Sequence, residues 1–99
     1  MTGPYEIHDN EGAVSIPIDG ILDLHNFSPK DIRYLVPDYL EECYRAKIFH
    51  VRIVHGKGVG NLRRTVHAIL DKLTLVASYR LADERAGGWG ATLVELKRK

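Results

Sequence analysis

Residues able to exchange protons stand at the ends of two apolar segments. His25 directly follows GILDL, residues 20–24, and His55 directly follows IFHVRIV, residues 48–54. Histidine at such a position can exchange a proton near neutral pH or donate a hydrogen bond to a phosphate oxygen. Asp23 lies two residues before His25, inside the first apolar segment, where a carboxylate is costly unless it is paired. Its carboxylate can orient an imidazole, bind a metal or act as a base, and a structural hydrogen bond to loop amides is nearly as well supported.

A glycine-rich segment follows His55, and an amphipathic segment with paired arginines begins after it. The glycines alternate along HGKGVG, residues 55–60, and they are Gly56, Gly58 and Gly60. Glycines let backbone amides approach an anion at the amino end of a helix, where Lys57, Arg63 and Arg64 can add charge-assisted hydrogen bonds. The spacing matches neither a P-loop nor the dinucleotide motif G-x-G-x-x-G, because Asn61 stands where the third glycine is required. Spacing alone slightly favours an ordinary turn over a phosphate-binding loop.

Two further features have functional and structural interpretations. Trp89 lies between glycines in GGWG, residues 87–90, where its ring can stack on a nucleic-acid base or, with equal support, cap the core. Asp23, His25 and His55, two imidazoles and one carboxylate, can also ligate a divalent metal, although the sequence does not establish that they do. Of the remaining histidines, His50 and His67 are interpreted as surface or partly buried structural residues, and His8 has no assigned role.

The composition is that of one globular domain. The chain has 99 residues, of which 44% are hydrophobic and 27% charged, and this length suffices for a single core. No apolar run approaches the roughly 20 residues of a membrane span, and the amino terminus lacks the pattern of a signal peptide, so we expect a cytoplasmic protein without a membrane partner. The single cysteine, Cys43, excludes an intrachain disulfide. With a net charge of +1, any contact with nucleic acid falls to local cations beside the glycines.

Periodicity predicts an α/β fold with elements in the order β-α-β-α-β-β. The predicted strands are residues 20–24, 48–54, 75–81 and a fourth beginning at residue 91. The first helix has Ser28 as its N-cap, followed by Pro29, and the second begins near Asn61. The apolar stripes of the two helices are Ile32, Leu35, Val36, Tyr39, Leu40 and Cys43, then Leu62, Val66, Ile69, Leu70 and Leu73.

The amino-terminal part has a separate prediction. Residues 1–13 are expected to be a flexible arm and residues 14–99 a single domain, and residues 13–20 can add an extra strand at an edge of the sheet.

The order of the elements predicts where the polar residues meet. Strand–helix–strand connections normally give parallel neighbouring strands with a right-handed crossover, so the first three strands should point the same way. His25 and His55 would then emerge at the carboxyl edge of the sheet, where open α/β sheets bind ligands. If the last strand returns antiparallel, the loop 82–90 lies at that edge as well. We therefore predict a site at this edge.

Three blocks of the sequence resemble those of a known family. LDLHN at 22–26, HGKGVGNLR at 55–63 and GGWGATLVEL at 87–96 are similar, in this order, to the blocks of the Smr, or small MutS-related, domain. The resemblance covers roughly residues 18–97 and is to a stand-alone member. It implies a two-layer α/β sandwich with a mixed four-stranded sheet carrying two helices, like the carboxy-terminal domain of bacterial translation initiation factor three. Members are associated with nicking of DNA or endonucleolytic cleavage of DNA or RNA.

The resemblance also implies site residues. The L-D-x-H block corresponds to Asp23 and His25, and the H-G-x-G block to residues 55–58, namely His55, Gly56, Lys57 and Gly58. Where the family commonly has glycine after the first histidine, this chain has Asn26, which tolerates unusual backbone angles better than most residues.

The leading hypothesis is a nucleic-acid-binding endonuclease that hydrolyses a phosphodiester. Asp23 orients His25 or helps to activate water, and His25 or His55 acts as general base or acid. The glycine amides, Lys57 and Arg63 stabilise charge on the phosphate, and magnesium or manganese bound through Asp23 is compatible with this chemistry. The alternatives are a non-catalytic module that binds branched or single-stranded nucleic acid, and a protein-interaction domain.

Overall fold

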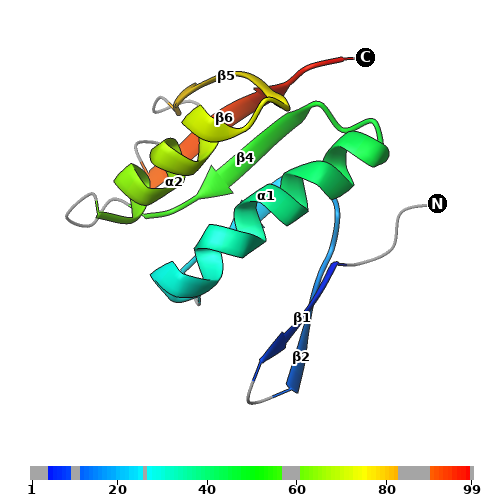
Figure 1. The fold of residues 1–99 in the computed structure, drawn as a ribbon, viewed down its shortest axis with the longest axis vertical. Helices are drawn as coiled ribbons and strands as arrows, with labels where there is room; N and C mark the ends of the chain where they lie inside the picture. Colours follow the sequence, from blue (N-terminus) through cyan, green and yellow to red (C-terminus); the bar gives the residue numbers. More distant parts are fainter. Residues whose placement is uncertain (1–4, 10–11, 26, 57–60, 83–89, 99) are drawn as a thin grey trace.

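The computed structural model describes residues 5–9, 12–25, 27–56, 61–82 and 90–98 (Figure 1). Its elements in chain order are β1 (Tyr5–Asp9), β2 (Gly12–Ile16), β3 (Ile21–Asp23), α1 (Pro29–Arg45), β4 (His50–Val54), α2 (Asn61–Lys72), β5 (Val76–Leu81) and β6 (Ala91–Leu96). From β3 onward this is the predicted order of strands and helices, and it confirms the α/β class.

Helix α1 begins where its local sequence predicts. The Ser28 hydroxyl accepts a hydrogen bond from the backbone N–H of Asp31 at 3.2 Å and donates one to the Asp31 carboxylate at 3.0 Å. Pro29 occupies the first helical position, where its missing N–H costs nothing. All six predicted stripe residues are buried, from Ile32 to Cys43. Burial also raises the pKa of the Cys43 thiol to about 11, which confirms its interpretation as a core residue.

The main sheet has the strand order β3-β4-β6-β5. Strand β3 runs parallel to β4, and β6 runs antiparallel to both β4 and β5, so β3, β4 and β5 all point the same way as predicted. The expectation that these three are neighbours is wrong for β5, because β6 is inserted between β4 and β5. This insertion places the start of β6 beside the end of β4, where Val54 is paired with Ala91.

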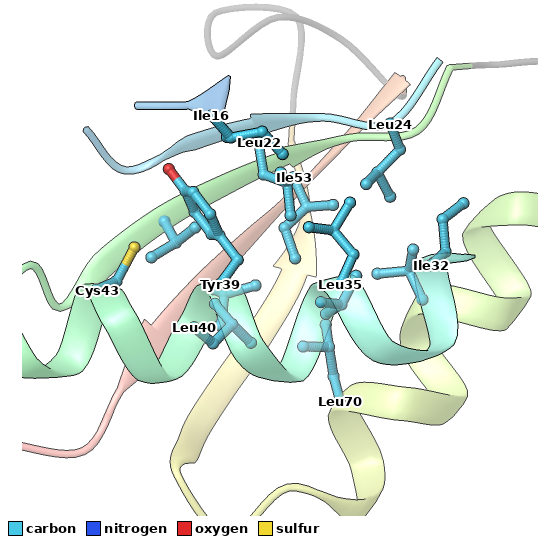
Figure 2. Close-up of a cluster of buried hydrophobic side chains, with 14 of the residues drawn as sticks. Ile16, Leu22, Leu24, Ile32, Leu35, Tyr39, Leu40, Cys43, Ile53 and Leu70 are labelled. Atoms are coloured by element: carbon cyan, nitrogen blue, oxygen red, sulfur yellow. The ribbon is translucent and has the colours of Figure 1, made fainter. Parts of the chain in front are cut away.

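Both helices cover one face of the sheet, which makes the two-layer sandwich (Figure 1). Inward residues of the strands, such as Leu22, Ile53 and Val94, pack against the stripes of α1 and α2. Figure 2 shows the Tyr39 ring projecting from α1 toward Leu22 and Ile16. The opposite face of the sheet carries exposed side chains instead, including Ile21, which is 53% exposed. That second face is called the open face below.

The turn before β3 is fixed by a hydrogen bond from the core. The backbone N–H of Gly20 donates to the Tyr39 hydroxyl at 3.1 Å, and this oxygen lies 3.2 Å from the carbonyl of Ile21. Gly20 has φ +91°, a left-handed conformation, and a Cβ there would lie 3.2 Å from the carbonyl oxygen of His50. The position therefore requires glycine, and Tyr39 anchors the start of the strand that carries Asp23.

Strands β1 and β2 form a two-stranded antiparallel sheet of their own. The extra strand expected near residues 13–20 is thus present as β2, but it pairs with β1 rather than with an edge of the main sheet. The hairpin projects away from the helices (Figure 1). Flexibility of residues 1–13 stays a prediction, and residues 1–4 and 10–11 lie outside the described residues.

Candidate active site

Asp23 and His25 form a close pair at the carboxyl end of β3. The Asp23 Oδ1 atom lies 2.7 Å from His25 Nδ1 and also accepts the backbone N–H of His25 at 3.0 Å. These hydrogen bonds, the side-chain one foremost, lower the pKa of Asp23 below its ordinary value of 3.8. Because an ionised carboxylate only accepts hydrogen bonds, Nδ1 of His25 carries the proton in the neutral ring, and Nε2 carries a lone pair.

This pair is open to solvent. The side chains of His25 and Asp23 are 68% and 51% exposed, and within the described part of the chain His25 Nε2 makes no hydrogen bond. The premise that Asp23 is a costly buried carboxylate is therefore wrong, since β3 alternates and Asp23 points to the open face. Asp23 nevertheless orients an imidazole and makes a structural hydrogen bond, as predicted, because its Oδ1 atom accepts from both the His25 ring and the His25 backbone amide. The exposed Nε2 has the chemistry of a general base.

His55 lies in a different environment. Its side chain is buried, with 5% of the residue exposed, and it packs on the side of the sheet that carries the helices. Its Nδ1 atom lies 3.0 Å from the carbonyl oxygen of Gly56, and its Nε2 atom lies 2.8 Å from the Thr92 hydroxyl. With both ring nitrogens occupied by protein groups, His55 is arranged to hold neighbouring structure rather than to exchange a proton with a ligand.

A second imidazole reaches the same hydroxyl. His67 of α2 places its Nε2 atom 2.8 Å from Thr92 Oγ1, and Thr92 has no exposed surface. The pKa of His67 is lowered, chiefly by burial and then by the charges of His55 and Arg63. The interpretation of His67 as a surface or structural residue agrees with this contact, whereas the sequence interpretation missed Thr92. One signal pointed to Thr92, because it alternates with the inward residues Val94 and Leu96, and a polar group at such a position needs a partner.

Main-chain hydrogen bonds gather the predicted segments at one edge of the sheet. The carbonyl of Gly90 accepts the backbone N–H groups of both His55 and Gly56 at 2.8 Å. Beside them, the N–H of Leu24 donates to the carbonyl of Val54 at 2.9 Å. Gly56 itself has φ +83°, a conformation that favours glycine. The prediction of a common edge is confirmed for these described residues.

The two predicted histidines nevertheless do not form one cluster. His25 contacts Asp23 on the side of the open face, whereas His55 contacts Thr92 on the helix side. Sequence reasoning placed both at the carboxyl edge but could not assign their faces. Among the described residues, no group of three acidic, histidine or cysteine side chains is placed to hold a metal ion, so Asp23, His25 and His55 do not form a joint metal site.

The predicted cationic and aromatic contacts are only partly described. Arg63 is half-buried and Arg64 exposed, both in the first turn of α2 beside the glycine segment. Five residues of the predicted site region lie outside the described residues, and they are Asn26, Lys57, Gly58, Gly60 and Trp89.

The open face has a hollow that sequence reasoning did not anticipate. It has a volume of about 680 Å³, and its lining includes Ile21, Arg52, Leu93 and Arg80. Strand pairing sets these four in one row across the sheet, the next row on this face after Asp23. Asp19 and Glu95 also line the hollow, but Glu95 pairs with His50 in the row beyond. Along the strands, Arg52 and Arg80 therefore lie one row closer to Asp23 than Glu95 does.

These features define a class: a two-layer α/β domain with a mixed sheet that carries an exposed Asp–His pair, with Gly56 at the same edge of the sheet. The model of the Smr domain matches residues 22–97, and the chain belongs to this family. It is 39% identical over 80 residues to the endonuclease MutS2 of Clostridium botulinum (strain Eklund 17B / Type B), and 38% identical over 76 residues to that of Halothermothrix orenii. The first of these alignments covers 81% of the chain, which spans about 10% of the length of either relative.

Solved structures agree with this assignment. The Smr domain of Thermus thermophilus MutS2 superposes with a TM-score of 0.73 at 31% identity, covering 78% of this chain and 96% of that one. YdaL from Escherichia coli, a stand-alone small MutS-related protein, superposes with a TM-score of 0.70 at 27% identity, covering 79% of this chain and 64% of its own. No helix in the described part of the chain is long and apolar enough to cross a membrane.

Proposed function

We propose that this Smr domain is an endonuclease that hydrolyses phosphodiester bonds of nucleic acid. The observation that carries the proposal is the exposed Asp23–His25 pair, with 2.7 Å between Oδ1 and Nδ1 and with no hydrogen bond from a described residue to Nε2. Related proteins that contain a similar domain are named as endonucleases. Because the chain covers a tenth of their length, activity in this domain is our inference.

The chemical step follows from the tautomer of His25. Nε2 accepts a proton from a water molecule as its oxygen forms a bond to phosphorus, and the bond between phosphorus and the leaving oxygen breaks. The leaving oxygen then takes up a proton from the imidazolium or from solvent. Asp23 stabilises the imidazolium through Nδ1–H, because an opposite charge at hydrogen-bond distance favours the charged ring. His25 is thus the base in our proposal, and Asp23 orients it.

The phosphate itself requires positive groups beside the base. We propose the amides of Gly58 and Gly60, with Lys57 and the α2 arginines, for this role, because amides at a helix start favour anions. The Gly56 amide instead donates to the Gly90 carbonyl. Trp89 is proposed to stack on a base. His55 is better suited to hold this segment than to serve as the alternative acid or base, since it is 5% exposed and both its ring nitrogens contact protein atoms.

We further propose that the polymer runs over the open face beside Asp23. Arg52 and Arg80 line the hollow there, and no described acidic side chain is paired with either guanidinium. If these arginines contact phosphates, Arg52→Ala and Arg80→Ala should each weaken binding by about the same factor for every nucleic-acid sequence. Each should also reduce the slope of the logarithm of the binding constant against the logarithm of the salt concentration by roughly 1. Lys30→Ala, which changes an exposed cation in the first turn of α1, serves as the control. Unchanged affinity in both arginine variants would remove the open face from the proposal.

The test of activity uses the purified chain with supercoiled plasmid and, separately, a labelled structured RNA. Each substrate is incubated with magnesium, manganese or a chelator, because a role for either ion through Asp23 stays a prediction. Asp23→Asn and His25→Ala should abolish cutting, whereas Lys72→Ala, which changes an exposed residue in the last turn of α2, should not. Cleavage identifies the polymer. Salt-sensitive binding without cleavage would indicate a binding module, and neither effect would favour a protein-interaction domain. A cytoplasmic location also stays a prediction.

A further inference from the structure

A series of buried and partly buried hydrogen bonds links Gly56, at the start of the glycine segment, to helix α2. It runs from the Gly56 carbonyl through His55 and the Thr92 hydroxyl to His67, with distances of 3.0, 2.8 and 2.8 Å. Thr92 has no exposed surface, and no buried side-chain nitrogen or oxygen in the described part of the chain lacks a partner. The donor and the acceptor of each of these hydrogen bonds can be assigned, starting from the Gly56 carbonyl.

The assignment begins at Gly56. Its carbonyl oxygen only accepts, so His55 Nδ1 must donate, and the neutral ring then has a lone pair at Nε2. That lone pair accepts the hydroxyl proton of Thr92. A hydroxyl has one proton to give, so the Thr92 oxygen must accept from His67, whose Nε2 therefore carries a proton. Each of the two imidazoles is thereby held in a defined and different tautomer.

We propose that Thr92 and His67 are positioning residues, which hold His55 as its Nδ1–H tautomer and so fix the start of the glycine segment. Both polar groups of Gly56 take part, because its N–H donates to the Gly90 carbonyl and its carbonyl accepts from His55. Without the Thr92 hydroxyl, Nε2 of His55 no longer accepts a hydrogen bond, and His55 is no longer confined to the tautomer that donates to Gly56. The Gly56 carbonyl is then free to turn. Only the value of this geometry for phosphate binding rests on the proposed function.

These hydrogen bonds lie on the helix side of the sheet, away from the proposed base. His25 and Asp23 contact each other on the open-face side, and no described contact joins them to His55 or Thr92. Loss of the Thr92 hydroxyl is therefore expected to raise KM, or the Kd for nucleic acid, by roughly five- to tenfold, the effect of one lost hydrogen bond. The value of kcat should change by less than about twofold on the same reasoning.

The test reads the tautomers directly and needs no activity. Long-range proton–nitrogen NMR spectra of the imidazoles should show His55 with its proton on Nδ1 and His67 with its proton on Nε2 near neutral pH. Thr92→Val keeps the shape but removes the hydroxyl, so the His55 signals should move toward a mixture of tautomers. Thr92→Ser should restore the wild-type pattern. His50, which is exposed and contacts Arg98, is the internal reference and should stay unchanged in every variant.

The outcomes separate this inference from the endonuclease proposal. A proton on Nε2 of His55 in the wild type, or a Thr92→Val spectrum identical to the wild type, would overturn the assignment whether or not the protein cuts nucleic acid. Should Thr92→Val not fold, the wild-type spectrum and a His67→Gln variant, whose amide can still donate to Thr92, decide the matter. His67→Gln should keep the Nδ1–H form of His55, and His67→Leu should lose part of it.

Discussion

The phenol of Tyr39 offers a demanding test of how the fold positions the site. Tyr39→Phe removes one buried oxygen and leaves the packing of the ring on the core intact. The oxygen accepts the N–H of Gly20 at 3.1 Å, and Gly20 is buried in a turn that only glycine fits. A buried donor left without a partner costs about 1–3 kcal/mol, so the variant should lose that much free energy of unfolding. For a domain of this size, each 1 kcal/mol lowers the melting temperature by roughly 4–8 °C.

The assay is urea unfolding followed by circular dichroism, with Tyr34→Phe as the matched control. Tyr34 lies on the same helix but is 69% exposed, so its variant should be within about 0.5 kcal/mol of the wild type. Tyr39→Phe should lower the midpoint without changing the slope. Equal stability of the two variants would refute the reasoning, because it would mean that the Gly20 amide finds another partner at no cost.

Three further predictions follow from individual groups. The carboxyl of Asp23 should titrate with a pKa below 3.8 in carbon-detected NMR, because His25 donates hydrogen bonds to it. Its contribution to stability is therefore fully present above pH 3.8 and is lost as the pH falls through the lower pKa of the folded state. A titration midpoint at or above 3.8 would contradict this prediction. Cys43 should react with a thiol reagent only on unfolding, since burial raises its pKa to about 11, and rapid labelling of the native protein would disprove it. Ser28→Ala should cost about 1 kcal/mol of unfolding free energy through loss of the N-cap, whereas exposed Ser78→Ala should cost less; equal losses would argue against the cap.

Local features of the fold could be predicted well from the sequence. The start of α1 depends on Ser28, Pro29 and Asp31, and the stripe that follows repeats at helical spacing. The common direction of β3, β4 and β5 follows from the handedness of crossover connections, which any such chain obeys. These features need no knowledge of distant contacts, and all of them are confirmed by the structure.

Features that depend on distant pairing could not be predicted. The place of β6 between β4 and β5 is decided by hydrogen bonds between segments far apart in the sequence. The same insertion brings Thr92 to His55, 37 residues away, and to His67, 25 residues away. The face occupied by each histidine follows from this register, so the sequence predicted the edge of the site without showing that His25 and His55 lie on different sides.

The central claim is that the Asp23–His25 pair performs chemistry rather than binding alone. The most direct measurement compares cleavage and binding of one substrate by the wild type, Asp23→Asn, His25→Ala and Lys72→Ala at equal protein concentration. Our account predicts that the first two variants lose cleavage while keeping their affinity for the substrate, and that Lys72→Ala, which changes an exposed residue in the last turn of α2, keeps both. Cleavage by His25→Ala at the wild-type rate would contradict the assignment of the base.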